Sequence, residues 1–169
     1  MRQGGLLVGA LAVVLTACGV GGGSGNEASV ACGPVTRERL DPSSPVHLLP
    51  GAPEPDYLSD PPTSGPHLSG RPPSGISAEP LDRPTQVLVL EEGGVLIQHR
   101  GLDGADAARL GELAGDQVVV APNPELPSPV VATAWLAKRT CDEVDVAALR
   151  QFVEEHLGRG PDGGEAASS

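Results

Sequence analysis

Prolines crowd the segment from Gly33 to Pro84, where apolar residues are sparse. A proline ring fixes φ, removes a backbone donor and disfavours helix in the residue before it. The composition therefore predicts an extended, irregular arm with few helices or strands of its own. The regular structure of the chain must lie after Pro84, and the arm can be ordered only by packing on it.

From Thr85 onward the composition changes to apolar and β-branched residues. Val87–Leu90 and Val95–Ile97 indicate two strands around the turn Glu91–Gly94, so we predict a β-hairpin. One long strand with a bulge at the glycines is the alternative.

Four further elements follow the predicted hairpin. Asp103–Gly115 has a capping aspartate, apolar residues on one face and a terminal glycine, and it predicts a helix. Gln117–Ala121 indicates a buried strand, and Val130–Lys138 a strand that ends near Cys141. Asp145–Leu157 has apolar residues at helical spacing and predicts the last helix.

The expected order is strand, strand, helix, strand, strand, helix. Strands paired as hairpins, with helices on one face, predict an α+β fold: a two-layer domain of a small β-sheet with two helices, preceded by the Pro-rich arm. We expect one domain, over residues 32–157.

The N-terminus carries an apolar run, Leu6–Leu15, followed by Thr, Ala and Cys18. This is a lipobox, in which the leader is cut away and the cysteine acylated. We predict a signal peptide over 1–17, a flexible Gly-rich spacer over 18–31 and a disordered tail over 158–169. A transmembrane anchor requires about 20 apolar residues, more than this run offers, so an ordinary secretory signal is the remaining alternative.

The net charge of −11, with basic residues scattered along the chain, disfavours nucleic acid as a partner. We expect the lipid bilayer to be the partner of acylated Cys18, on the extracytoplasmic face of the cell membrane. A second partner would be an envelope protein or cell-wall material.

The chain has three cysteines. If Cys18 carries lipid, Cys32 and Cys141 remain, and two thiols outside the cytoplasm favour a disulfide. A redox pair is the first alternative, although the close Cys-x-x-Cys spacing is missing. Metal binding together with a histidine is the second.

A Pro-rich string and several shorter segments carry a family resemblance. They are Pro61-Pro62-Thr63-Ser64-Gly65-Pro66-His67, preceded by His47 and Tyr57, then Leu90-Glu91, Ala121-Pro122-Asn123-Pro124 and Ala134-Trp135. They resemble an uncharacterised family of exported bacterial proteins, domain of unknown function 3105, many of whose members are lipoproteins or membrane-tethered. The resemblance covers roughly His47 to Pro161 and implies no established activity.

The chain departs from this family at two histidines. The family's hairpin has the pattern His-x-Leu-Glu-His-Gly, which together with the histidine of the Pro-rich string implies a metal site. Here the two positions are Leu88 and Glu92. A residual copper or zinc site of His47, His67 and Glu92 is the alternative to having no cofactor.

The motif residues also have structural interpretations. His67 in a rigid loop is expected to bind backbone groups of the arm, and Trp135 to pack in or beside the core. Glu91 and Glu92 are expected to be solvated in the turn. Ser64 lies three residues before His67, yet no strand-turn-helix elbow surrounds it.

Three classes of function follow. The anchor, the spacer and the substituted histidines favour a non-enzymatic envelope lipoprotein that presents a surface, such as the arm, to a partner. A metal-binding protein with a degenerate site is the alternative. A hydrolase, supported only by Ser64, His67 and Glu91, is the third.

Overall fold

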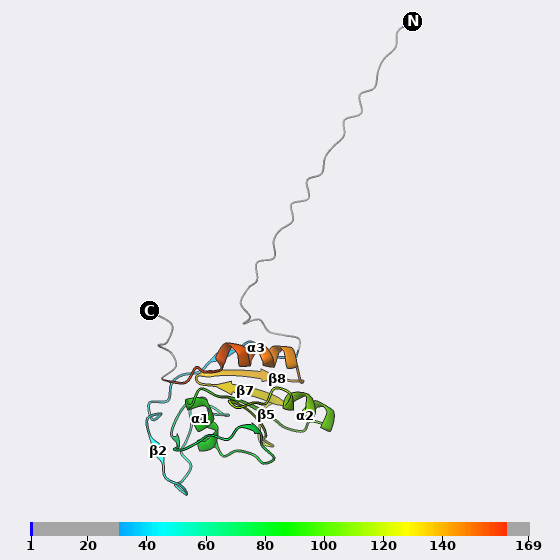
Figure 1. The fold of residues 1–169 in the computed structure, drawn as a ribbon. Coiled ribbons are helices and arrows are strands. Elements are labelled where there is room, and N and C mark those ends of the chain that lie inside the picture. The colour runs from blue at the N-terminus through cyan, green and yellow to red at the C-terminus, as the bar shows by residue number, and fades with distance from the viewer. Residues whose placement is uncertain (2–30, 162–169) are drawn as a thin grey trace.

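The computed structural model describes Met1 and residues 31–161, which form one mixed sheet with three helices (Figure 1). The predicted leader beyond Met1, the lipidation site Cys18, the spacer up to residue 30 and the tail from residue 162 lie outside the described residues. Within the described part, no helix has the length and apolarity needed to cross a bilayer.

Six strands form the main sheet, in the order β1-β8-β7-β5-β6-β4. Their bounds are Thr36–Arg37 (β1), Gly75–Ile76 (β4), Val95–His99 (β5), Val118–Pro122 (β6), Val130–Ala134 (β7) and Ala137–Cys141 (β8). The β4, β5 and β6 strands are parallel, whereas β7 is antiparallel to both β5 and β8, and β1 to β8. Separately, β2 (His47–Leu48) pairs in parallel with β3 (His67–Leu68).

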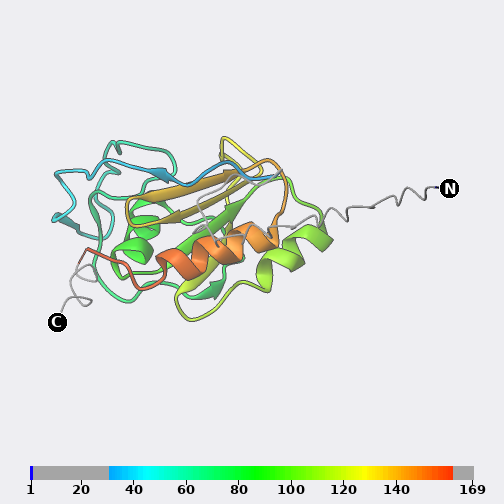
Figure 2. The same cartoon turned by 90° about the horizontal axis from the view of Figure 1, so that it is seen from above.

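Helices cover both faces of the sheet. On one face, α2 (Gly104–Gly111) and α3 (Val146–His156) bury Leu110, Leu149 and Phe152 against the strands. Figure 2 shows these two helices side by side over the sheet. On the other face, α1 (Arg83–Glu91) buries Val89 and Leu90 against β5 and β6. Figure 1 shows α3 and α1 on opposite sides of β7.

The α+β class is confirmed. The two predicted helices are α2 and α3, and Asp103 and Asp145 cap them as expected. The predicted strand at Gln117–Ala121 is β6. The sheet with α2 and α3 on one face is present as predicted, and a third helix, α1, covers the opposite face together with the arm. The predicted helix from Asp103 ends earlier than expected, at Gly111.

The predicted hairpin over residues 85–97 is wrong, as is its alternative of one long strand. The first half is α1, and only the second half is a strand, β5. Asp82 accepts a hydrogen bond from Thr85 N and caps the helix, and Pro84 fits its first turn. The residues Val87–Leu90 are all buried, since α1 lies between the sheet and β3 of the arm. A helix covered on opposite sides can be apolar all round, which removes the amphipathic signal.

The single strand predicted over Val130–Lys138 is also wrong. The structure forms β7 and β8, joined by a tight turn at Trp135 and Leu136. Leu136 has a φ of 55°, the one positive value among described non-glycine residues, so no glycine marks the turn.

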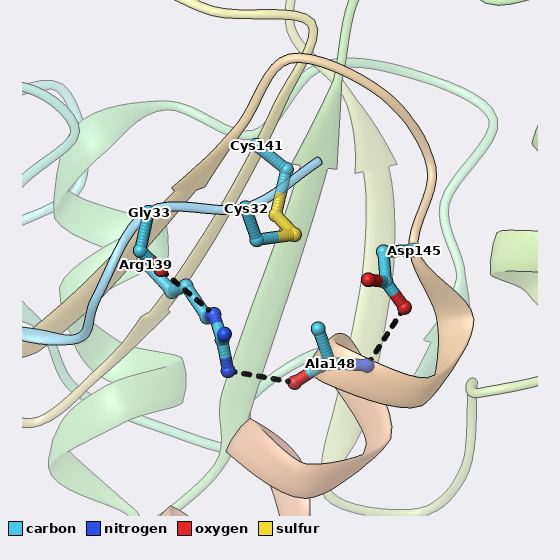
Figure 3. The surroundings of a disulfide bond; sticks show 6 residues. All are labelled: Cys32, Gly33, Arg139, Cys141, Asp145 and Ala148. Carbon is cyan, nitrogen blue, oxygen red and sulfur yellow. Dashed lines mark hydrogen bonds between the residues drawn. A yellow bond between two sulfur atoms is a disulfide. The ribbon is translucent and has the colours of Figure 1, made fainter. Parts of the chain in front are cut away.

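The arm is irregular, as predicted, with only two-residue strands. Its start runs antiparallel to β8: Asp142 N donates to Ala31 O at 2.8 Å and Gly33 N to Thr140 O at 2.9 Å. Between these bonds lies the predicted disulfide, Cys32–Cys141, which is confirmed (Figure 3).

Arg139 extends this attachment to α3. Its Nε donates to Gly33 O at 3.1 Å, and its guanidinium donates to Ala148 O at 3.2 Å, as Figure 3 shows. The buried guanidinium therefore bridges the start of the arm and the first turn of α3.

Replacing Cys32 and Cys141 together by alanine is expected to lower the free energy of unfolding by about 4 kcal/mol. The bridge spans 109 residues, and its loss frees that loop in the unfolded chain. Urea unfolding followed by circular dichroism measures the change. Thiol reduction of the wild-type protein should give a similar loss. A loss below about 1 kcal/mol would contradict the prediction.

Candidate functional site

The Pro-rich string is buried without a break from Pro61 to His67. It lies beneath the rest of the arm and leads into β3, which packs against α1. A string with three prolines has few backbone donors to satisfy, so it can be buried in an irregular conformation. These motif residues therefore form the packed base of the arm.

Ser64 joins two parts of the arm. Its Oγ accepts a hydrogen bond from Asp41 N at 2.9 Å. The Asp41 carboxylate in turn accepts from Ser43 N at 2.8 Å, and Ser44 Oγ donates to Asp41 O at 2.7 Å. Ser64 and Asp41 are both buried, so this hydroxyl serves as an internal acceptor that fixes the turn after Leu40.

Gly65 is required by its contact with Tyr57. Its φ is +132°, and a Cβ there would lie 2.8 Å from Tyr57 Cδ1. Tyr57 Oη donates to Pro66 O at 2.7 Å, and the Arg83 guanidinium lies 5.3 Å from the ring centroid. Burial, followed by the nearby Glu54 carboxylate, raises the pKa of Tyr57, so the phenol stays a donor.

His67 is held by the backbone of its own string, as expected. Its Nδ1 lies 3.1 Å from Gly65 O. A carbonyl oxygen only accepts, so Nδ1 carries the proton. In the neutral ring Nε2 is then an acceptor, and it has no hydrogen-bond partner among the described residues. The nearest charged atom is Glu91 Oε2 at 3.6 Å.

The structure brings together some of the predicted metal ligands. The rings of His47 and His67 lie edge to face, with centroids 4.8 Å apart. The carboxylate that faces His67 is Glu91, whereas Glu92 is exposed at the C-cap of α1. No group of three His, Cys, Asp or Glu side chains suited to a metal ion occurs within residues 31–161.

Leu88 and Glu92, which the sequence analysis placed on a hairpin, lie in the last turn of α1 and at its C-cap. Leu88 and Glu92 are one helical turn apart, and Glu92 N donates to Leu88 O at 3.2 Å. Positions four apart share a face of a helix. Glu91 is three positions after Leu88 and therefore lies on the same side of α1. Leu88 is buried, so this side of the helix is apolar one turn before Glu91.

The β7–β8 turn, which holds Trp135, meets the Pro-rich string. The neighbouring Leu136 donates its N–H to Thr63 O at 3.1 Å and accepts from Glu38 N at 3.0 Å. Trp135 itself is half-buried and packs against the core beside α1, as its structural interpretation expected. Motif residues that are far apart in the sequence are therefore adjacent in the fold.

A hollow of about 430 Å³ lies between the arm and this turn. It is called the arm hollow below, and it is lined by Leu40, Asp41, Pro42, Ser44, Pro45, Glu91, Trp135 and Pro161. This volume is within the usual range for small-molecule sites. The arm hollow thus includes two of the family-motif residues, Glu91 and Trp135.

Sequence reasoning missed the Asp41 side of this hollow and the role of Glu91 beside His67. The pair Asp82 and Pro84 is a helix-start signal, and reading it would have placed Glu91 on a helix. Nothing in the sequence indicated that the turn at Asp41 would pack beside that helix, because the intervening arm has no regular pattern.

A buried chain of amides was also missed. Asn123 Nδ2 donates to Gln98 Oε1 at 2.6 Å, Gln98 Nε2 to Gln86 Oε1 at 3.1 Å, and Gln86 Nε2 to Leu81 O at 2.8 Å. The detectable signal was a glutamine at one end of each of two apolar runs, Gln86 before Val87–Leu90 and Gln98 after Val95–Ile97. Gln86 and Asn123 also line a second hollow, of about 450 Å³, near the start of α1.

Comparison with known proteins gives one match. The profile of a family described as "Protein of unknown function (DUF3105)" matches residues 53–169. No curated protein and no solved structure matches the chain significantly.

Ser64→Ala is expected to lower the free energy of unfolding by about 1 to 3 kcal/mol, because it leaves the buried Asp41 N–H without its acceptor. Ser77→Ala is the matched control, since its hydroxyl donates at an exposed site. Urea unfolding of both variants provides the measurement. Equal stability of the two variants would show that the Ser64 hydroxyl does not hold the arm.

Proposed function

The chain belongs to the DUF3105 family of proteins of unknown function, and we propose that it is a membrane-anchored envelope lipoprotein whose domain binds another envelope protein through its Pro-rich arm. The anchor is acylated Cys18 and the domain stands off the membrane on the Gly-rich spacer. The interaction is non-enzymatic.

The observation that carries this proposal is the place of the exposed apolar side chains. Five of the seven large hydrophobic residues that are exposed in the described part lie on the arm. We call four of them the arm surface: Leu40, Val46, Leu49 and Leu58. The fifth, Ile76, is on β4, at the opposite edge of the sheet from β1. Apolar groups on an acidic chain are better suited to an apolar protein surface than to polar cell-wall glycan.

The arm surface is carried on a fixed base. The disulfide holds the arm's start on β8, and the buried Pro-rich string holds its middle against α1. A partner that binds this surface does not have to order the arm first, and preorganisation of this kind lowers the entropic cost of binding.

An extracytoplasmic location is supported by two features. The leader runs into a lipobox at Cys18, and the domain has a buried Cys32–Cys141 disulfide. Structural disulfides persist in oxidising compartments and are rare in the cytosol. The negative net charge makes the acyl chains, and not electrostatic attraction to anionic lipid, the source of membrane attachment.

A photo-crosslinking amino acid placed at Leu49 in living cells is expected to give a discrete crosslinked protein, whereas the same group at Leu157 gives none. Both leucines are exposed, at 78% and 40%, but only Leu49 is on the arm. Leu58→Ser should weaken the Leu49 crosslink several-fold. Cys18→Ser should abolish the incorporation of labelled palmitate and leave the fold unchanged.

Two results would contradict this function. Equal crosslinks from positions 49 and 157 would show that the arm is not the interaction surface. Equal palmitate labelling of the wild-type and Cys18→Ser proteins would show that Cys18 does not carry the lipid.

A metal-binding role is the second candidate, because the acceptor atom His67 Nε2 faces Glu91 Oε2 at 3.6 Å beside the His47 ring. Glu91 takes the place that the sequence assigned to Glu92. The described residues do not gather the three or four ligands of an ordinary protein zinc site. A copper or zinc ion here would have His67 and Glu91 as its protein ligands and solvent as the remainder.

If this candidate holds, purified protein dialysed against zinc or copper should retain one equivalent by elemental analysis, and His67→Ala should retain none. His156→Ala is the control, because that imidazole packs on Phe152. Retention at the background level in the wild-type protein would remove the metal candidate.

A further inference from the structure

The hollow near the start of α1, called the amide hollow below, lies where the connections of the parallel strands diverge. The chain leaves β4 for α1 on one face of the sheet and β5 for α2 on the other, and β6 lies between these two strands. The amide hollow is lined by residues 80–83, which lead into α1, and by residues 123–125, which follow β6. In open sheets, ligands bind outside the carboxyl ends of parallel strands at such a switch point.

A chain of three amides ends at this hollow, and its polarity is fixed from both ends. Leu81 O can only accept, so Gln86 Nε2 donates to it, at 2.8 Å. At the other end Glu125 N can only donate, and it binds Asn123 Oδ1 at 3.1 Å. Gln98 joins the two ends, because it donates to Gln86 and accepts from Asn123. The Asn123 amide therefore has one defined orientation.

The three amides differ in exposure. Gln86 and Gln98 are 3% and 1% exposed, whereas Asn123 is half-buried and lines the hollow. A primary amide has two N–H bonds and two acceptor positions, and the bonds to Gln98 and Glu125 use one of each on Asn123. Asn123 thus offers one further donor and one further acceptor at the wall of the hollow, and the buried amides hold them in place.

The charged groups of the lining determine which ligand fits. Four carboxylates and the guanidinium of Arg83 line the amide hollow, and Arg83 Nε donates to Glu54 Oε1 at 2.6 Å. The excess of carboxylates repels an anion. A cation is attracted by the carboxylates, but an ammonium group has no lone pair to accept from Arg83 or Asn123. A hydroxyl group both donates and accepts, so a neutral ligand with several hydroxyls can use every polar group of this wall.

From the placement of the hollow and the fixed amide of Asn123, we infer that the amide hollow binds a neutral sugar. One hydroxyl of the ring accepts from Asn123 Nδ2 and another from the Arg83 guanidinium, and both donate to carboxylates of the wall. The C–H groups of the ring pack on Leu81 and Pro124. The volume of about 450 Å³ is that of a small-molecule site.

Saturation-transfer NMR on the purified full-length protein tests the site. The neutral probes are glucose, galactose and mannose, and each is compared with the amino sugar and the uronate of the same configuration. At least one neutral hexose should give a saturable signal. Its uronate should bind about tenfold or more weakly, and its amino sugar should bind no more tightly than the neutral parent.

Two variants locate the binding site. Asn123→Ala and Arg83→Gln should each weaken binding of that hexose by about tenfold, because each removes a donor to the ring. Arg109→Gln is the matched control and should leave binding unchanged, since Arg109 is also an exposed arginine paired with a carboxylate but lies on α2. Thermal unfolding of each variant checks its fold, and the comparison of probes on the wild-type protein requires no variant.

The inference is overturned if none of the neutral hexoses gives a saturable signal, or if the amino sugars bind while their neutral parents do not. The second result would show that the carboxylates alone attract the ligand. Unchanged affinity in folded Asn123→Ala and Arg83→Gln proteins would also overturn it. The site is independent of the proposed partner of the arm surface, because Leu49 does not line the amide hollow and a failed crosslink there leaves the sugar titration unaffected.

Discussion

Cys32 and Cys141 join the first residues of the Pro-rich arm to the last residue of β8, and the arm's conformation depends on that crosslink. The backbone bonds on either side of it make the arm's start an antiparallel neighbour of β8. Arg139 carries the attachment on to α3. An irregular segment loses much conformational entropy when it is ordered and makes few hydrogen bonds of its own in return. A covalent bond that restricts the unfolded chain offsets part of that cost.

The second constraint is the burial of α1 between the sheet and the arm. One side of the helix packs on β5 and β6, while β3 packs against it from the arm. The arm thus takes the place that a second helix layer occupies in many α/β domains. Its buried string provides the packing surface, and its outer turns carry the exposed apolar residues. The proposed partner surface depends on this division between the inner and outer sides of the arm.

Some elements of this fold could be predicted from the sequence, and others could not. The helices at Asp103 and Asp145 were predictable, because each has a capping aspartate and one apolar face. The disulfide was predictable from the number of cysteines and the predicted compartment. The helix α1 was not recognised, because burial on opposite sides removed the polar face that identifies a helix. The β7–β8 turn was missed because its positive φ lies on Leu136, a residue with no turn preference.

The sequence by itself determined the cysteine pair, the irregularity of the arm and the chemical groups available for a site. These properties depend on residue type and short spacing, which are read directly along the chain. Only the tertiary structure decided that Glu91 and not Glu92 faces His67, and that Asp41 and Trp135 line the same hollow. These contacts depend on how the arm folds back over α1 and the β7–β8 turn. No local periodicity encodes the path of a segment that has almost no regular structure.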